Sequence, residues 1–96
     1  MNYKVIYHPL LHQDIQEVVD WYNGKKDYLG NTFYHFTQEQ IDIITKNPFL
    51  FQIRYKDIRC VKIKKFPYLI HYSIDDKNEA IVIKAVFSTF RNPKIW

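Results

Sequence analysis

The spacing of apolar residues changes at Asn47-Pro48, and this change limits the possible folds more than any other feature of the sequence. Before this point, apolar residues recur every three or four positions, which is the period of a helix with one buried face. After it, apolar and polar residues tend to alternate, which is the period of a half-buried strand. The residue before a proline also avoids the α conformation, so a helix should end here. The sequence therefore predicts helices before Pro48 and a sheet after it.

Two helices are expected before Pro48. The first should begin at Pro9, which suits the first turn of a helix, and end near Gly24. Its buried stripe consists of Leu11, Ile15, Val18, Val19 and Tyr22. The second should run from about Leu29 to Lys46. Its buried side consists of Phe33, Phe36, Ile41 and Ile44. Because the connection between them is short, the two helices should form an α-hairpin.

Five strands should form the sheet. The first covers residues 2–7, ahead of the helices. The other four are expected at residues 51–55, 58–66, 68–75 and 79–87. Short connections, one of them at Pro67, predict that these four strands form a meander. The chain should thus have an α+β fold with the order β-α-α-β-β-β-β, in which the helical hairpin covers one face of a small, mainly antiparallel sheet.

Length and composition fit one domain over residues 1–96. Hydrophobic residues make up 47% of the chain and aromatic residues 18%, which argues against disorder. No apolar run approaches the ~18 residues that a membrane span requires, and the N-terminal residues read as a strand instead of a signal peptide. The single cysteine, Cys60, excludes an intramolecular disulfide and fits a reducing cytoplasm. We expect Cys60 to pack within its strand.

Charge is distributed unevenly along the chain. Residues 1–51 hold four Lys residues against six Asp and Glu residues. Residues 52–96 hold ten Lys and Arg residues against four acidic ones. A basic half of this kind suggests a polyanionic partner, such as RNA, DNA or an acidic polypeptide.

Strand alternation predicts which basic residues share a face. Val61 and Ile63 suit the helix-covered core, so Lys62 and Lys64 should project to the open face. The next strand should add Leu69, His71 and Ser73 to that face. In the last strand, Ile81, Ile83, Ala85 and Phe87 should point inward, and Val82, Lys84 and Val86 outward.

Two interpretations of this open face remain. Antiparallel sheets commonly leave one face wet, and lysines are ordinary there, as a half-exposed His71 would be. Alternatively, the lysines form a surface that grips phosphate or acts on it. The lack of acidic residues on this face of the last three predicted strands favours the second interpretation. His8 and His12 lie four residues apart, but no further ligand completes a metal site, so neither a metal nor another cofactor is expected.

Four segments resemble the RelE/ParE superfamily of bacterial toxins. They are DIQEVVDWY, NPFLF, IRCVKIKKFPYLIHYSID and AVFSTFRNPKIW. The resemblance runs from the first strand to Trp96, and it implies a small cytoplasmic toxin of a type II toxin–antitoxin, or plasmid stabilisation, module. It also implies a cognate antitoxin whose acidic, partly disordered segment covers the basic surface of the toxin.

The resemblance leaves two targets open. RelE-like toxins are ribosome-dependent mRNA interferases, metal-independent endoribonucleases that use lysines and arginines to stabilise negative charge at the reacting phosphate. ParE-like toxins lack this set and bind DNA gyrase. Lys62 and Lys64 match the paired lysines of the RelE-like site, and Arg91 is the candidate for one of its arginines. Leu69 stands where RelE-like toxins carry another arginine, which favours gyrase as the target.

Four further residues complete the expected site. His71 would be a general base beside Lys62 and Lys64, with a pKa lowered by the surrounding lysines. Arg59, Lys84 and Trp96 are expected to contribute to binding.

Overall fold

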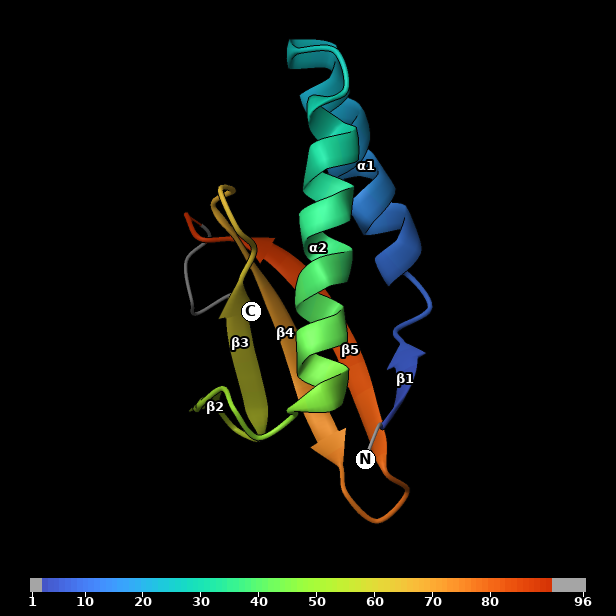
Figure 1. Ribbon diagram of the computed structural model, residues 1–96, viewed down its shortest axis with the longest axis vertical. Helices are drawn as coiled ribbons and strands as arrows, with labels where there is room; N and C mark the ends of the chain where they lie inside the picture. The colour runs from blue at the N-terminus through green and yellow to red at the C-terminus, as the bar shows by residue number, and fades with distance from the viewer. Residues whose placement is uncertain (1–2, 91–96) are drawn as a thin grey trace.

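The computed structural model describes residues 3–90, in which two helices lie against one face of a five-stranded sheet (Figure 1). In chain order, the elements are β1 (Lys4–Tyr7), α1 (Leu11–Lys25), α2 (Leu29–Lys46), β2 (Ile53–Tyr55), β3 (Ile58–Lys62), β4 (Tyr68–Asp75) and β5 (Ala80–Ser88). This order and layering confirm the predicted fold class. Neither helix is long and apolar enough to cross a membrane, within the part of the chain that the structure describes.

The strands lie side by side in the order β1-β5-β4-β3-β2. The last four, β2 to β5, pair antiparallel with one another and form the predicted meander. The first strand, β1, lies parallel to β5 at one edge of the sheet, and β2 forms the other edge. The helical hairpin lies between β1 and β2 in the chain, and both helices cover the same face (Figure 1).

One buried core joins the helices to the sheet. Leu11, Ile15 and Val19 from α1 and Phe33, Ile41 and Ile44 from α2 pack against Val61, Ile70, Tyr72, Ile81 and Ile83 from the strands. Tyr22 extends this core with ring contacts to Phe33, Phe66 and Tyr68. The buried hydroxyl of Tyr72 donates a hydrogen bond of 2.8 Å to the carbonyl of Pro48, so the segment after α2 is fastened to β4.

The third strand is shorter than the sequence predicts. It ends at Lys62, whereas alternation predicted a strand to residue 66. The segment 63–66 is a turn, in which the Phe66 amide donates to the Ile63 carbonyl at 3.3 Å. Lys65 adopts a left-handed conformation with φ 68°, which ends the alternation of side chains. The hairpin before Pro67 is therefore wider than expected.

The predicted faces of β5 are correct only in its first half. Ile83 pairs with Tyr72 and Ala85 pairs with His71, so Lys84 is an extra residue in β5. Such a β-bulge reverses the faces of the residues that follow it. Val86 therefore points into the core, where it is 7% exposed, while Ala85 and Phe87 share the face of His71. The prediction placed these three residues on the opposite faces.

Candidate functional site

The sheet face away from the helices is buried at its centre. Cys60 and His71 are register partners on β3 and β4, and they are 9% and 0% exposed. Ser73, two residues further along β4, is 7% exposed. The sequence predicted that this face is open and that His71 projects from it. That prediction is wrong because aromatic side chains from neighbouring strands cover the centre of the face.

Tyr55, Cys60 and Phe87 surround the imidazole of His71. Its Nδ1 atom lies 3.0 Å from the Tyr55 hydroxyl oxygen and 3.4 Å from the Cys60 Sγ atom. The ring of Phe87 meets the imidazole edge-on at a centroid distance of 5.0 Å. Because a hydroxyl and a thiol can both donate, this geometry favours a neutral imidazole whose Nδ1 accepts.

Burial also determines how these groups titrate. Burial and, to a smaller extent, the positive charge of Arg54 together lower the pKa of His71 from 6.5 to about 4. The lysines that were expected to lower this pKa do not act on it. Burial has the opposite effect on Cys60, where it raises the pKa of the thiol and favours the protonated form. Cys60 is buried within β3, where it was expected to pack.

The two candidate catalytic lysines point in different directions. Lys62 is exposed at the end of β3, and its Nζ donates to the Ile63 carbonyl at 3.3 Å. The Nζ of Lys64 instead lies 5.7 Å from the ring centroid of Phe36 on α2. Lys65 reaches the same ring at 5.6 Å. The prediction that Lys62 and Lys64 share the open face is therefore wrong, because the turn after Lys62 carries Lys64 to the helix side.

The other candidate residues are also separated. Arg59 is half-buried on the helix side of β3, where its Nη1 donates to the Phe51 carbonyl and its guanidinium lies 5.3 Å from the Phe49 ring. Lys84 is exposed at the bulge of β5. Leu69 is half-buried on β4, opposite Lys62. Arg91 and Trp96 lie outside the described residues.

Sequence reasoning missed the residues that build the centre of this face. Tyr55 was expected at the end of a strand and was given no part in this face, and Phe87 was assigned to the core because the bulge was not foreseen. Arg54, which is exposed on β2, influences both Cys60 and His71 electrostatically. The alternation of side chains in β3 and β4 could have predicted that Cys60 and His71 share a face. The contact between His71 and Tyr55 could not be predicted in this way, because it depends on the irregular pairing of β2 with β3.

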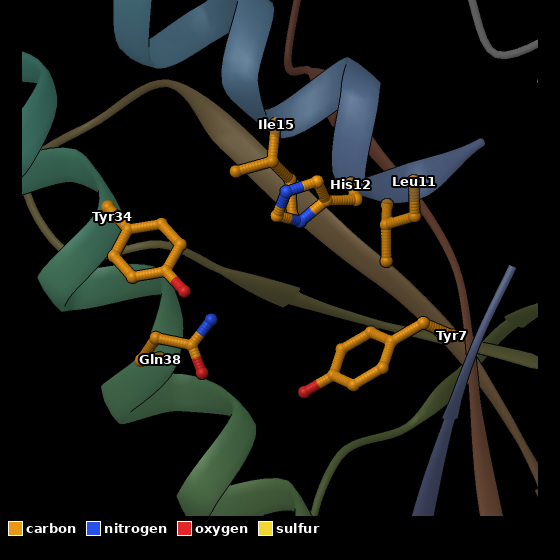
Figure 2. Close-up of a pocket in the computed structure, with 6 residues that line it drawn as sticks. All are labelled: Tyr7, Leu11, His12, Ile15, Tyr34 and Gln38. Atoms are coloured by element: carbon orange, nitrogen blue, oxygen red, sulfur yellow. The ribbon is translucent and has the colours of Figure 1, made fainter. Parts of the chain in front are cut away.

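The hollows of the structure lie elsewhere. A pocket of about 250 Å³ opens between α1 and α2, beside β1. Figure 2 shows the side chains of Tyr34 and Gln38 from α2 facing Tyr7 and His12 across this pocket. A second pocket, of about 280 Å³, lies between α1 and the ends of β4 and β5 and is lined by Asp14 and Glu17, among others. Among residues 3–90, no lysine or arginine lines either pocket.

Several exposed cations belong to β2, β3, β5 and the β2–β3 turn. Arg54, Lys56, Lys62 and Lys84 are exposed cations around a buried and neutral centre. In residues 3–90, moreover, no three His, Cys, Asp or Glu side chains lie close enough together to hold a metal ion.

A family model matches residues 5–93, which is most of the chain. The family is described as the ParE toxin of the type II toxin–antitoxin system parDE. No curated protein matches the sequence significantly.

Solved structures with the same fold come from several toxin–antitoxin systems. A chain of the chromosomal ParDE system from P. aeruginosa superposes with a TM-score of 0.77 at 10% identity, covering 90% of this chain and 95% of the other. The isolated E. coli toxin RelE has a TM-score of 0.72 at 14% identity, with 97% and 90% covered. The archaeal RelE–RelB complex from Pyrococcus horikoshii OT3 has a TM-score of 0.64 at 19% identity, with 96% and 100% covered. At these identities the likeness concerns the fold alone.

Proposed function

Because the chain belongs to the ParE toxin family of type II toxin–antitoxin systems, we propose that it inhibits growth by binding DNA gyrase and that a cognate antitoxin neutralises it. DNA gyrase and the antitoxin would both bind the toxin in the cytoplasm. Among the solved structures, the archaeal RelE relative is a complex with RelB. The exposed cations Arg54, Lys56, Lys62 and Lys84 would suit an acidic antitoxin segment.

The divergence of Lys62 and Lys64 is the observation that carries the choice of gyrase. An mRNA interferase of the RelE type would need cations gathered on one phosphate. Here Lys64 reaches Phe36 on the helix side, and the apolar Leu69 lies opposite Lys62. His71, which could have been the base, is enclosed by Tyr55 and Phe87. These features support a toxin that acts by binding a protein.

The proposal is tested by inducing the chain in cells that lack the antitoxin. We expect gyrase-linked DNA breaks and an SOS response, with cellular mRNA left intact. The variant Lys62→Ala/Lys64→Ala should remain toxic, as should the control Lys77→Ala, which alters an exposed lysine in the β4–β5 turn. Codon-phased cleavage of mRNA in the ribosomal A site, abolished by Lys62→Ala/Lys64→Ala, would contradict the proposal and assign the RelE-like activity.

A further inference from the structure

The connecting end of the helical hairpin lies beyond the sheet (Figure 1). We call residues 21–28 the hairpin tip. They comprise the end of α1 and the three-residue connection to α2, which ends with Tyr28. Two of the three aromatic side chains of the hairpin tip, Trp21 and Tyr28, are 58% and 76% exposed, whereas Tyr22 packs against the core. Tyrosine and tryptophan are enriched at protein interfaces, because each combines a large apolar ring with a polar group.

The hairpin tip is held in one geometry. Gly30 packs so closely on α1 that a Cβ atom at this position would lie 2.0 Å from the Val19 carbonyl oxygen. The side-chain oxygen of Asn23 accepts the Gly30 amide at 2.7 Å, and the Asn23 amide donates to Asn31 at 3.1 Å. A partner would therefore meet the exposed rings on a rigid support, which lowers the entropic cost of binding.

Tyr28 occupies a backbone conformation that does not suit a bulky residue. Only three residues separate the helices, and Tyr28 closes this connection with φ 66° and ψ 3°. Glycine or asparagine would adopt this left-handed conformation at lower energy. The other left-handed residues in the described range are Lys56, Lys65 and Glu79, all charged and all in turns between strands. Because the ring of Tyr28 is exposed, no burial within the molecule offsets the strain.

The charge of the hairpin tip favours a protein partner over a nucleic acid. Lys25 and Lys26 are balanced by Asp27 within the tip and by Asp20 beside it. A polyphosphate needs an excess of positive charge, which this region lacks. The Nζ of Lys25 lies 5.0 Å from the Trp21 ring, so its ammonium group accompanies the indole into any contact. Tryptophan and tyrosine beside a cation are typical of the energetic centres of protein interfaces.

We propose that the hairpin tip is the surface by which this toxin grips its target, with Trp21 and Tyr28 entering an apolar recess on a protein and Lys25 facing a carboxylate at the rim of that recess. The inference rests on the proposed function, because it takes the target to be a protein. It assigns target binding to the helical end of the molecule, away from the exposed cations of the sheet.

The test compares Trp21→Ala and Tyr28→Gly with Tyr34→Ala, which removes an aromatic ring that is 45% exposed elsewhere on α2. Growth inhibition is measured after induction without antitoxin, and inhibition of supercoiling is measured with purified gyrase and relaxed plasmid. Each tip variant should need at least about tenfold more protein for the same inhibition, as expected when an interface loses a central aromatic side chain. Tyr34→Ala should behave like the wild type. Because glycine relieves the strain at position 28, Tyr28→Gly should retain its fold.

The outcomes separate this inference from the proposed function. Unchanged growth inhibition by a folded Tyr28→Gly variant would overturn the role of the tip. Weakened binding of a fluorescent single-stranded DNA oligonucleotide by both tip variants would assign the tip to nucleic acid and also overturn it. If the wild-type chain leaves gyrase active but the tip variants lose growth inhibition, the gyrase target is wrong and the tip inference stands. A wild-type chain that does not inhibit growth would overturn both.

Discussion

The side chain of His71 on β4 contacts residues of two other strands. Its imidazole lies within hydrogen-bonding distance of the Tyr55 hydroxyl on β2, while the residue itself belongs to β4. The strand between them, β3, contributes Cys60 to the same contact. Since β2 has only three residues and pairs irregularly with β3, this side-chain contact helps to fix the edge strand and the cation of Arg54 that it carries.

The low pKa of His71 predicts a loss of stability in weak acid. The unfolded chain binds a proton at this residue below about pH 6.5, whereas the folded chain does so only near pH 4. Between these pH values the unfolded state holds one more proton than the folded state. The free energy of unfolding should therefore decrease by up to about 1.4 kcal/mol for each unit by which the pH is lowered. Urea unfolding at pH 7, 6, 5 and 4.5 measures this slope.

The variant His71→Gln should reduce that slope, because glutamine does not titrate. The matched control is His35→Gln, since His35 is exposed on α2 and its Nε2 lies 3.0 Å from Glu39. The His35→Gln variant should show nearly the same dependence of the free energy of unfolding on pH as the wild type. A slope that is equally steep in wild type and His71→Gln would show that another group is responsible.

At the scale of elements, the hairpin depends on close contact between its helices. The closest approach is at Gly30, where the Val19 carbonyl occupies the space that a side chain would need. Gly30→Ala should therefore destabilise the protein by roughly 1–3 kcal/mol, the usual cost of overpacking a tight site. Gly24→Ala should instead stabilise it by up to about 1 kcal/mol, because nothing lies within 4 Å of an added Cβ there and alanine favours the helix.

Urea unfolding of the two alanine variants measures both effects. The comparison is stringent because the two glycines lie on the same hairpin, in α1 and α2, and receive the same methyl group. Equal stability of the Gly30→Ala and Gly24→Ala variants would mean that the helices can separate without cost.

Elements with strong local signals were predictable. The second helix was expected from Leu29 to Lys46 and is found there, because Pro48 forces its end. The strand at residues 68–75 was also predicted with its observed bounds. The first helix ends at Lys25, one residue after the predicted end. Each of these bounds follows from residues within a few positions of it.

The candidate site was less predictable because it depends on turns and on register. The left-handed turn at Lys65 decides where Lys64 points, and strand alternation carries no information about it. The bulge at Lys84 exchanges the faces of Val86 and Phe87, and it is defined only by pairing with β4. The burial of His71 requires Tyr55 and Phe87, which lie 16 residues away in each direction.

At the scale of the whole molecule, the helices and the sheet share one core. Tyr22 on α1 touches Phe33 on α2 and both Phe66 and Tyr68 on the sheet side. We therefore expect one cooperative unfolding transition. In native-state hydrogen exchange, the slowest amides of α1, α2 and β4 should report the same opening free energy. A hairpin that opens at lower free energy than β4 would contradict this expectation.

The parallel pairing of β1 with β5 has a consequence for the nascent chain. Val5 on β1 finds its partner Ile81 only when β5 has been made, because β5 is the later of the two strands in the chain. Until then, one edge of β4 also lacks its neighbour. A prematurely terminated product that stops before β5 has neither pairing and cannot build this sheet. The chain must therefore include β5 before this five-stranded sheet can form.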